Sequence, residues 1–296
     1  MIPPRQLARE PWDALLETNV RATFPHCRKD AKGASFESEV CHPASSAPQH
    51  VDAVFLRSPR EHVFSQFRMC HNSTHGKNVG FRQSAFYLER LAGVSLIEGF
   101  GGWLQHFVDT NGRADLPCYN PHNLQARALV CNGSQPMDSH HFSPNVTLSR
   151  ALASMCAVSV LGVVELYHES LCLLRTAITR ELPAVCACDG GTEETHHRSS
   201  QHTFVTHGLG TSSDLFDALP PTVLQQIDRL TVVDRALYAA GFSRVLYDIA
   251  RIESTHGRQF LCTGRTRTLL DDPRLQYLQM AEARAVLEAR LPKAPR

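Results

Sequence analysis

A short apolar run that ends in arginine, serine and proline constrains the fold of this chain more than any other feature of its sequence. Residues 52–56 are rich in valine and phenylalanine and predict a buried strand. Ser58 is a good N-cap, and Pro59 suits the first helical position because its φ is preset and it has no N–H to leave without a partner. The apolar residues that follow at helical spacing predict a helix directly after the strand.

The corner between this strand and this helix is suited to bind a phosphate. Arg57 closes the strand, and Ser65 lies about two turns into the helix. Backbone N–H groups and the helix dipole already favour an anion at such a corner. The same pattern also fits an ordinary strand–turn–helix with a solvated arginine and a capping serine, so this segment does not decide between the two interpretations.

A second buried strand is predicted for residues 158–164, where the apolar run is continuous rather than alternating. Strands that are buried on both faces and followed by helices imply an α/β fold with a parallel sheet. We expect residues 52–56 and 158–164 to be neighbouring strands of that sheet, with helices on both of its faces.

Two further helices are predicted near the C-terminus. One begins at Thr231 and runs to about Ser254, and Asp234 stands three residues after Thr231, the spacing of a capping box. The last is expected from residue 273 to residue 291 and is polar on most of its faces.

Composition narrows the classes of protein to consider. The net charge of the 296-residue chain is +1, which gives no reason to expect a nucleic-acid partner. No apolar run reaches the length of a membrane span. Ten cysteines are many for a cytosolic protein, and three glycosylation sequons accompany them, at Asn72, Asn132 and Asn145. Cysteines and sequons together favour an oxidising lumen.

The first segment resembles the 3′-phosphate-binding motif of sulfotransferases that use PAPS (3′-phosphoadenosine 5′-phosphosulfate), and most closely that of the Golgi carbohydrate sulfotransferases. The residues that carry this resemblance are Arg57, Pro59, Arg60, Ser65 and Phe67. Three later segments resemble further parts of the same enzymes, in the same order along the chain. They are an Asn-x-Gln-x-Arg segment within 119–129, a strand-to-helix unit with Gly-x-x-Glu and Ser-Leu within 161–174, and an Asp-x-x-Leu-Tyr helix within 230–238.

This resemblance implies a P-loop-like three-layer α/β fold with a central parallel sheet flanked by helices. We expect one sulfotransferase-like domain over residues 1–270 and a C-terminal helical tail over 271–296. The implied activity is transfer of a sulfuryl group from PAPS to a hydroxyl of a carbohydrate. Arg57 and Ser65 would bind the 3′-phosphate. Arg127 would contact donor or acceptor, or would be an ordinary arginine on a helix surface.

The resemblance also places a general base between the phosphate-cradling loop of these enzymes and the Arg57 motif. We favour His26 for this role, with Glu37 as the second candidate. No convincing cradling loop is found, because residues 32–35 have some of its residue types but follow no strand. We therefore expect the chain to begin after that loop and after the N-terminal membrane anchor of a type II Golgi protein, and to transfer sulfate poorly as it stands.

Two alternatives remain open from the sequence. A catalytically inactive homologue would keep the phosphate corner and act as a glycan- or nucleotide-binding module. A nucleotide kinase is a weaker possibility, since it lacks the same loop and explains neither the sequons nor the cysteines. The partner expected for the enzyme is a glycan or glycoconjugate, with the membrane reached only through the N-terminal anchor.

The cysteines near residue 186 invite a comparison with zinc sites. Cys186 and Cys188 are separated by one residue, and His196 and His197 are adjacent, whereas zinc ligands are usually spaced by two to four residues. We therefore expect disulfides or free thiols here and no bound metal. A bridge from Cys118 to Cys131 would close the Asn-x-Gln-x-Arg loop, but pairing does not follow from sequence alone.

Overall fold

A computed structural model describes residues 51, 53–72, 74–78, 80–113, 116–117, 119–130, 146–188, 216–272, 277–278 and 280–291. All of them belong to one compact unit. The N-terminal candidates for a general base, His26 and Glu37, lie outside these residues, as does the expected bridge between Cys118 and Cys131.

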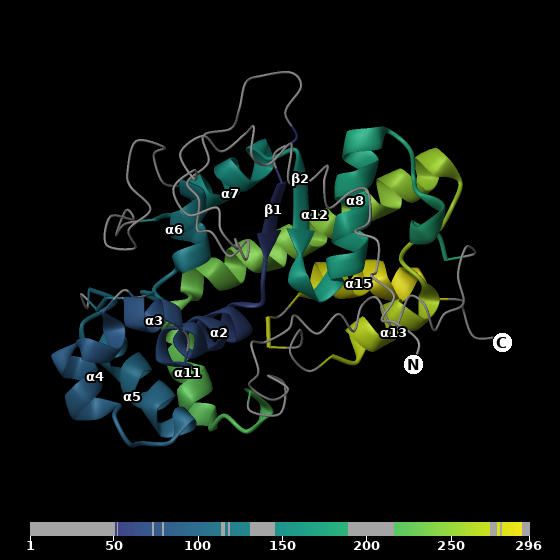
Figure 1. Ribbon diagram of the computed structural model, residues 1–296. Coiled ribbons are helices and arrows are strands. Elements are labelled where there is room, and N and C mark those ends of the chain that lie inside the picture. Colours follow the sequence, from purple (N-terminus) through teal and green to yellow (C-terminus); the bar gives the residue numbers. More distant parts are fainter. Residues whose placement is uncertain are drawn as a thin grey trace, which may run out of the picture. The chain divides into compact units, whose positions relative to one another are not determined.

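The described part of the chain is mostly helical and contains a two-stranded parallel sheet (Figure 1). Strand β1 (Ala53–Leu56) pairs with β2 (Val160–Val163), with Ala53 opposite Val160 and Leu56 opposite Val163. The prediction that these two segments are neighbouring parallel strands is confirmed. The sheet is compatible with an α/β class.

The helices of the described part follow the strands or lie between them. Their bounds are α2 Pro59–Asn72, α3 Thr74–Asn78, α4 Ala85–Arg90, α5 Leu96–Asp109, α6 Leu124–Val130, α7 Leu148–Ala157, α8 Tyr167–Thr179, α11 Pro221–Leu230, α12 Val232–His256, α13 Thr263–Leu270 and α15 Ala281–Ala289, with single 3₁₀ turns η2 Phe81–Gln83, η4 Val164–Leu166 and η5 Ala184–Cys186.

Helices cover both faces of the sheet, as its continuous apolar strands predicted. On one face, α12 approaches so closely that a Cβ on its Gly241 would lie 2.7 Å from Leu56 Cδ1. On the other face, a Cβ on Gly162 would lie 2.7 Å from the ring of Phe55 and 2.8 Å from Cβ of Ser170 in α8. Glycine therefore permits both close approaches.

A separate aromatic core joins α2, α5 and α11. Phe67, Phe100 and Trp103 are fully buried at its centre, and their ring centroids lie 5.2–6.1 Å apart. Phe64 of α2 contacts Phe100 edge to face at 5.0 Å. Phe64 and Phe67 lie on the apolar face of α2, away from Ser65. Their contacts therefore fix the orientation of α2 against α5 and α11.

Two expectations about the C-terminal half are wrong. The Thr231 side chain does not cap α12, because its hydroxyl donates to the carbonyl of Ile227, and Asp234 caps a different helix, as described below. The helix expected over 273–291 is not continuous, because Tyr277 and Leu278 lie in a turn and α15 covers only Ala281–Ala289.

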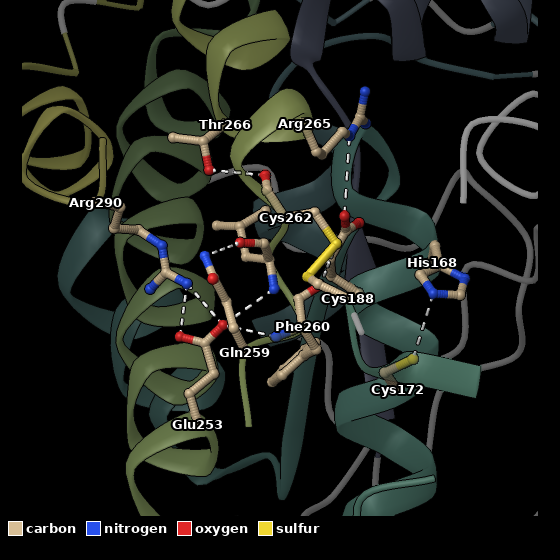
Figure 2. The surroundings of a disulfide bond; sticks show 12 residues. His168, Cys172, Cys188, Glu253, Gln259, Phe260, Cys262, Arg265, Thr266 and Arg290 are labelled. Carbon is tan, nitrogen blue, oxygen red and sulfur yellow. Dashed lines mark hydrogen bonds and ion pairs between the residues drawn. A yellow bond between two sulfur atoms is a disulfide. The ribbon is translucent and has the colours of Figure 1, made fainter. Parts of the chain in front are cut away.

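The C-terminal elements are tied to the rest of the fold by covalent and polar contacts (Figure 2). Disulfides join Cys172 to Cys186 and Cys188 to Cys262, so of the two states expected for Cys186 and Cys188, disulfide or free thiol, the structure shows the disulfide. Cys70 is disulfide-bonded as well. Beyond residue 270, helix α15 packs against α12 and α13. The division at residue 270 stays a prediction.

We expect Gly162→Ala to lower the free energy of unfolding by about 1–3 kcal/mol, because the new methyl group meets a ring and a Cβ atom in a packed layer. Chemical denaturation measures this change. Gly101→Ala in α5 is the matched control, because its methyl group would meet nothing nearer than Val223 Cγ2 at 3.5 Å. That control should be neutral or stabilising, and equal losses in the two variants would contradict the packing described here.

Candidate anion-binding corner

The candidate site lies where both strands end at the same edge of the sheet. Arg57 and Ser58 follow β1, and Glu165 follows β2. The backbone N–H of Ser58 donates to Glu165 Oε1 over 2.7 Å. This hydrogen bond joins the two strand-to-helix corners. The expectation that Glu165 orders its corner agrees with this contact.

Gln125 of α6 holds the backbone of Arg57 through both its N–H and its carbonyl. Its Oε1 accepts the N–H of Arg57 at 2.9 Å, and its Nε2 donates to the carbonyl of Arg57 at 2.9 Å. The side-chain amide thus replaces the pairing that a further strand would give to this residue. Arg57 is fixed one position beyond the strand, which sets the direction in which its side chain leaves the sheet.

The helix that carries Gln125 is held by a reciprocal pair of caps. Asn123 Oδ1 accepts the N–H of Val233 at 2.8 Å in the first turn of α12. In return, the Asp234 carboxylate of α12 accepts the N–H groups of Gln125 at 3.2 Å and of Ala126 at 2.8 Å in the first turn of α6. Each helix supplies the cap of the other. Asn123 has φ of 48°, a left-handed conformation that asparagine tolerates well.

Asp234 is fully buried, and burial raises its pKa from 3.8 to about 7. The hydrogen bonds from Ala126 and Gln125 and the charge of Arg127 oppose this rise. Arg127 is itself buried, and its guanidinium donates to the carbonyl of His122 at 3.3 Å. The structure therefore places Arg127 beside the capping pair, on the same short helix as Gln125.

The Arg57 side chain is partly exposed, with 26% of its surface accessible, and its Nε lies 3.8 Å from Glu61 Oε2. This separation is an ion pair without a hydrogen bond. Ser65 lies on the same helix, α2, and is half-buried. Arg57 and Ser65 therefore flank the first two turns of α2, as their spacing in the sequence indicated.

Arg60 has a structural role. Its guanidinium forms a bidentate pair with Asp228 of α11, with distances of 2.9 Å and 2.5 Å. The same group lies 3.7 Å from the ring centroid of Tyr277, whose hydroxyl is 3.1 Å from Ser58 Oγ. Arg60 thus ties α2 to α11 and to the C-terminal segment, with its Nε and Nη2 donors engaged by Asp228.

Two buried side chains that can lose a proton, Glu165 and Tyr238, lie beside the corner. Burial raises the pKa of Glu165, and the charge of Glu61 adds to that rise, whereas the nearby Tyr238 hydroxyl and the hydrogen bond from the Ser58 N–H oppose it. Burial and the Glu165 charge also raise the pKa of the Tyr238 phenol well above its usual value. The C-terminal helix α13 contacts the same point, because Arg265 donates to the carbonyl of Glu165.

The sequence alone did not indicate the residues that hold other side chains of the corner in place. Gln125 and Asn123 stand inside the Asn-x-Gln-x-Arg segment, so their motif marked them without assigning a role. Asp228 and Tyr277 carry no local signal. Of the predicted site residues, Arg57 lies between β1 and α2, Ser65 lies on α2, and Arg127 lies on α6 beside the neighbouring capping pair. Their roles stay predictions.

Among the described residues, no group of three or more histidine, cysteine or acidic side chains could hold a metal ion. Cys186 and Cys188 are consumed in disulfides and are therefore not thiolate ligands. Within the same part of the chain, no helix has the length and apolar character needed to cross a bilayer.

Comparisons with family models, with curated proteins and with solved structures each gave no match to this chain.

Asp234→Asn should flatten part of the pH dependence of stability. Because the folded pKa of this acid is higher than its unfolded value, the folded protein keeps a proton that the unfolded chain loses. The free energy of unfolding should therefore fall as pH rises from about 4 to about 7. Chemical denaturation of wild type and variant across this range gives the free energy of unfolding of each at every pH. The difference between the two curves isolates Asp234, because the other titrating groups are the same in both proteins. Parallel curves would show that Asp234 is already ionised in the fold.

Proposed function

We propose that this chain transfers a sulfuryl group from PAPS to a hydroxyl of a carbohydrate acceptor. The described sheet would be part of a P-loop-like three-layer fold, in which parallel strands lie between two layers of helices. Two parallel strands with α12 on one face and α8 on the other support this arrangement.

The observation that carries the proposal is the convergence of four segments that are far apart in the sequence. The three later segments that resemble sulfotransferases each supply a side chain that supports the Arg57 corner. Gln125 holds the backbone of Arg57, Glu165 accepts the N–H of Ser58, and Asp234 caps the helix of Gln125. Motifs that were independent in the sequence thus form one hydrogen-bonded assembly, which is what a shared function would require of them.

The chemistry of this corner suits the 3′-phosphate of the donor. Arg57, just before α2, supplies a partly exposed cation, and Ser65 on α2 supplies a hydroxyl. The positive end of α2 adds to the attraction for an anion. We assign the 3′-phosphate to Arg57 and Ser65, and we propose that Arg127 acts from the neighbouring α6.

In the proposed reaction, the acceptor oxygen attacks the sulfur in line as the bond from sulfur to the 5′-phosphate oxygen breaks. The hydroxyl proton passes to a general base, for which His26 remains our first candidate and Glu37 the second. The products are a sulfate ester and adenosine 3′,5′-bisphosphate. The two disulfides favour an oxidising compartment, and we propose the Golgi lumen.

Arg57→Ala and Ser65→Ala should each weaken binding of adenosine 3′,5′-bisphosphate by about 1.5–3 kcal/mol, the value of a hydrogen bond to a charged group. Isothermal titration calorimetry measures this loss. Adenosine 5′-monophosphate, which lacks the 3′-phosphate, should bind wild type and variants alike. Arg251→Ala is the matched control, because Arg251 is 61% exposed and pairs only with Asp248 among the described residues. If Arg57→Ala and Ser65→Ala weakened binding of the monophosphate as much as binding of the bisphosphate, Arg57 and Ser65 would not be ligands of the 3′-phosphate.

Turnover separates the enzyme from the inactive homologue. Incubation with radiolabelled PAPS and a mixture of glycans should give labelled sulfate ester only slowly, because no cradling loop for the 5′-phosphosulfate is found in the sequence, and Arg57→Ala should lower that rate further. Tight binding of the bisphosphate with no labelled product from any acceptor class would favour the glycan- or nucleotide-binding module instead.

A further inference from the structure

Two buried N–H donors at the Arg57 corner have no acceptor in the described part of the chain. They are Nε of Arg57 and Nδ1 of His62. A buried donor that is left without an acceptor costs about 1–3 kcal/mol, so each of these two donors calls for an explanation. The Arg57 charge is one of the causes that lower the pKa of His62, which places the two groups in the same electrostatic environment.

The hydrogen bonding of His62 indicates where its proton lies. Its Nε2 is 3.2 Å from Nε2 of Gln66, one turn later on α2. An amide nitrogen can only donate, so Nε2 of His62 accepts and the ring proton is on Nδ1. The enclosed Nδ1 atom is therefore a donor.

His62 stands midway along the polar face of α2. Residues at i, i+4 and i+7 of a helix share one face, so His62 follows Ser58 by one turn and precedes Ser65 by another. The N–H of His62 donates to the carbonyl of Ser58, which fixes this first turn. A phosphate that touches both Arg57 and Ser65 would pass directly beside the His62 ring.

The surroundings of His62 are positive. Burial, followed by the charge of Arg57, lowers its pKa to about 3, so the ring is neutral near pH 7. Burial and the same Arg57 charge also lower the pKa of Arg68, which is buried one turn beyond Ser65. Glu61 is the one carboxylate of α2, and it lies 3.8 Å from Arg57. An incoming anion would be attracted by both arginines without displacing a proton from His62.

We propose that Nδ1–H of His62 is a direct ligand of the anion bound between Arg57 and Ser65. The identity of that anion as the 3′-phosphate of a nucleotide rests on the proposed function. The inference that these donors bind a phosphate or sulfate group rests on their lack of an acceptor, on the helical spacing of His62 and Ser65, and on the nearby charge of Arg57. His62 thereby becomes a binding residue that adds selectivity for the 3′-phosphate and carries no charge of its own.

Two substitutions distinguish the two ring nitrogens. The amide of asparagine reaches the position of Nδ1, whereas the amide of glutamine reaches the position of Nε2. His62→Asn should therefore keep affinity for adenosine 3′,5′-bisphosphate within a few fold, and His62→Gln should lose about 10- to 100-fold, as for one hydrogen bond to a charged group. Neither variant should change the affinity for adenosine 5′-monophosphate.

Calorimetry with the full chain gives these affinities, and thermal unfolding checks that both variants fold equally well. Inorganic phosphate serves as a second probe. Loss of bisphosphate binding in His62→Gln with retention in His62→Asn supports the inference. Equal affinity of wild type, His62→Asn and His62→Gln, while Arg57→Ala still loses binding, overturns it and leaves the proposed function standing.

The same two probes also show whether the anion site can stand without the nucleotide donor of the proposed function. If bisphosphate binds no more tightly than inorganic phosphate, and both are lost in His62→Gln, the anion site is supported and the nucleotide donor is not. If wild type binds neither the bisphosphate nor phosphate, the anion site and the nucleotide donor are both overturned.

Discussion

The reciprocal capping of α6 and α12 is the contact on which the rest of the corner depends. Asn123 and Asp234 are more than one hundred residues apart, and each satisfies the free N–H groups at the start of the other's helix. Because α6 is fixed in this way, the Gln125 amide can pair with both the N–H and the carbonyl of Arg57. Without the caps, Gln125 would have no fixed position from which to orient that arginine.

Polar groups directed at backbone, rather than side-chain ion pairs, build most of this region. Glu165 accepts a backbone N–H, Arg265 donates to a backbone carbonyl, and Gln125 does both. Such contacts are specific to one geometry because donors and acceptors of the main chain have fixed directions. The buried acids Glu165 and Asp234 keep raised pKa values, so the interior of the corner resists the accumulation of negative charge. The anion that we propose for this corner would be attracted by Arg57 and Arg68.

The elements that local patterns could specify were predictable from the sequence. Continuous apolar runs report burial on both faces, so β1, β2 and their parallel pairing followed from residues 53–56 and 160–163. The partner of Asp234 did not follow, because a capping-box spacing says that a carboxylate is near a helix start and not which helix it caps. His62 gave no signal, since a lone histidine in an apolar helix looks like any other half-buried residue. Its two neighbours in space, Arg57 and Gln66, become meaningful only in three dimensions.

The two disulfides that meet at Cys186 and Cys188 have a consequence for how the chain reaches this structure. A single residue stands between these two half-cystines. Nevertheless, Cys186 pairs with Cys172 at a sequence separation of 14, and Cys188 pairs with Cys262 at a sequence separation of 74. The shorter loop closes with less loss of chain entropy, and either cysteine can attack the bond formed by the other. Correct pairing is therefore selected by thiol–disulfide exchange, and recombinant production calls for an oxidising compartment that contains a disulfide isomerase.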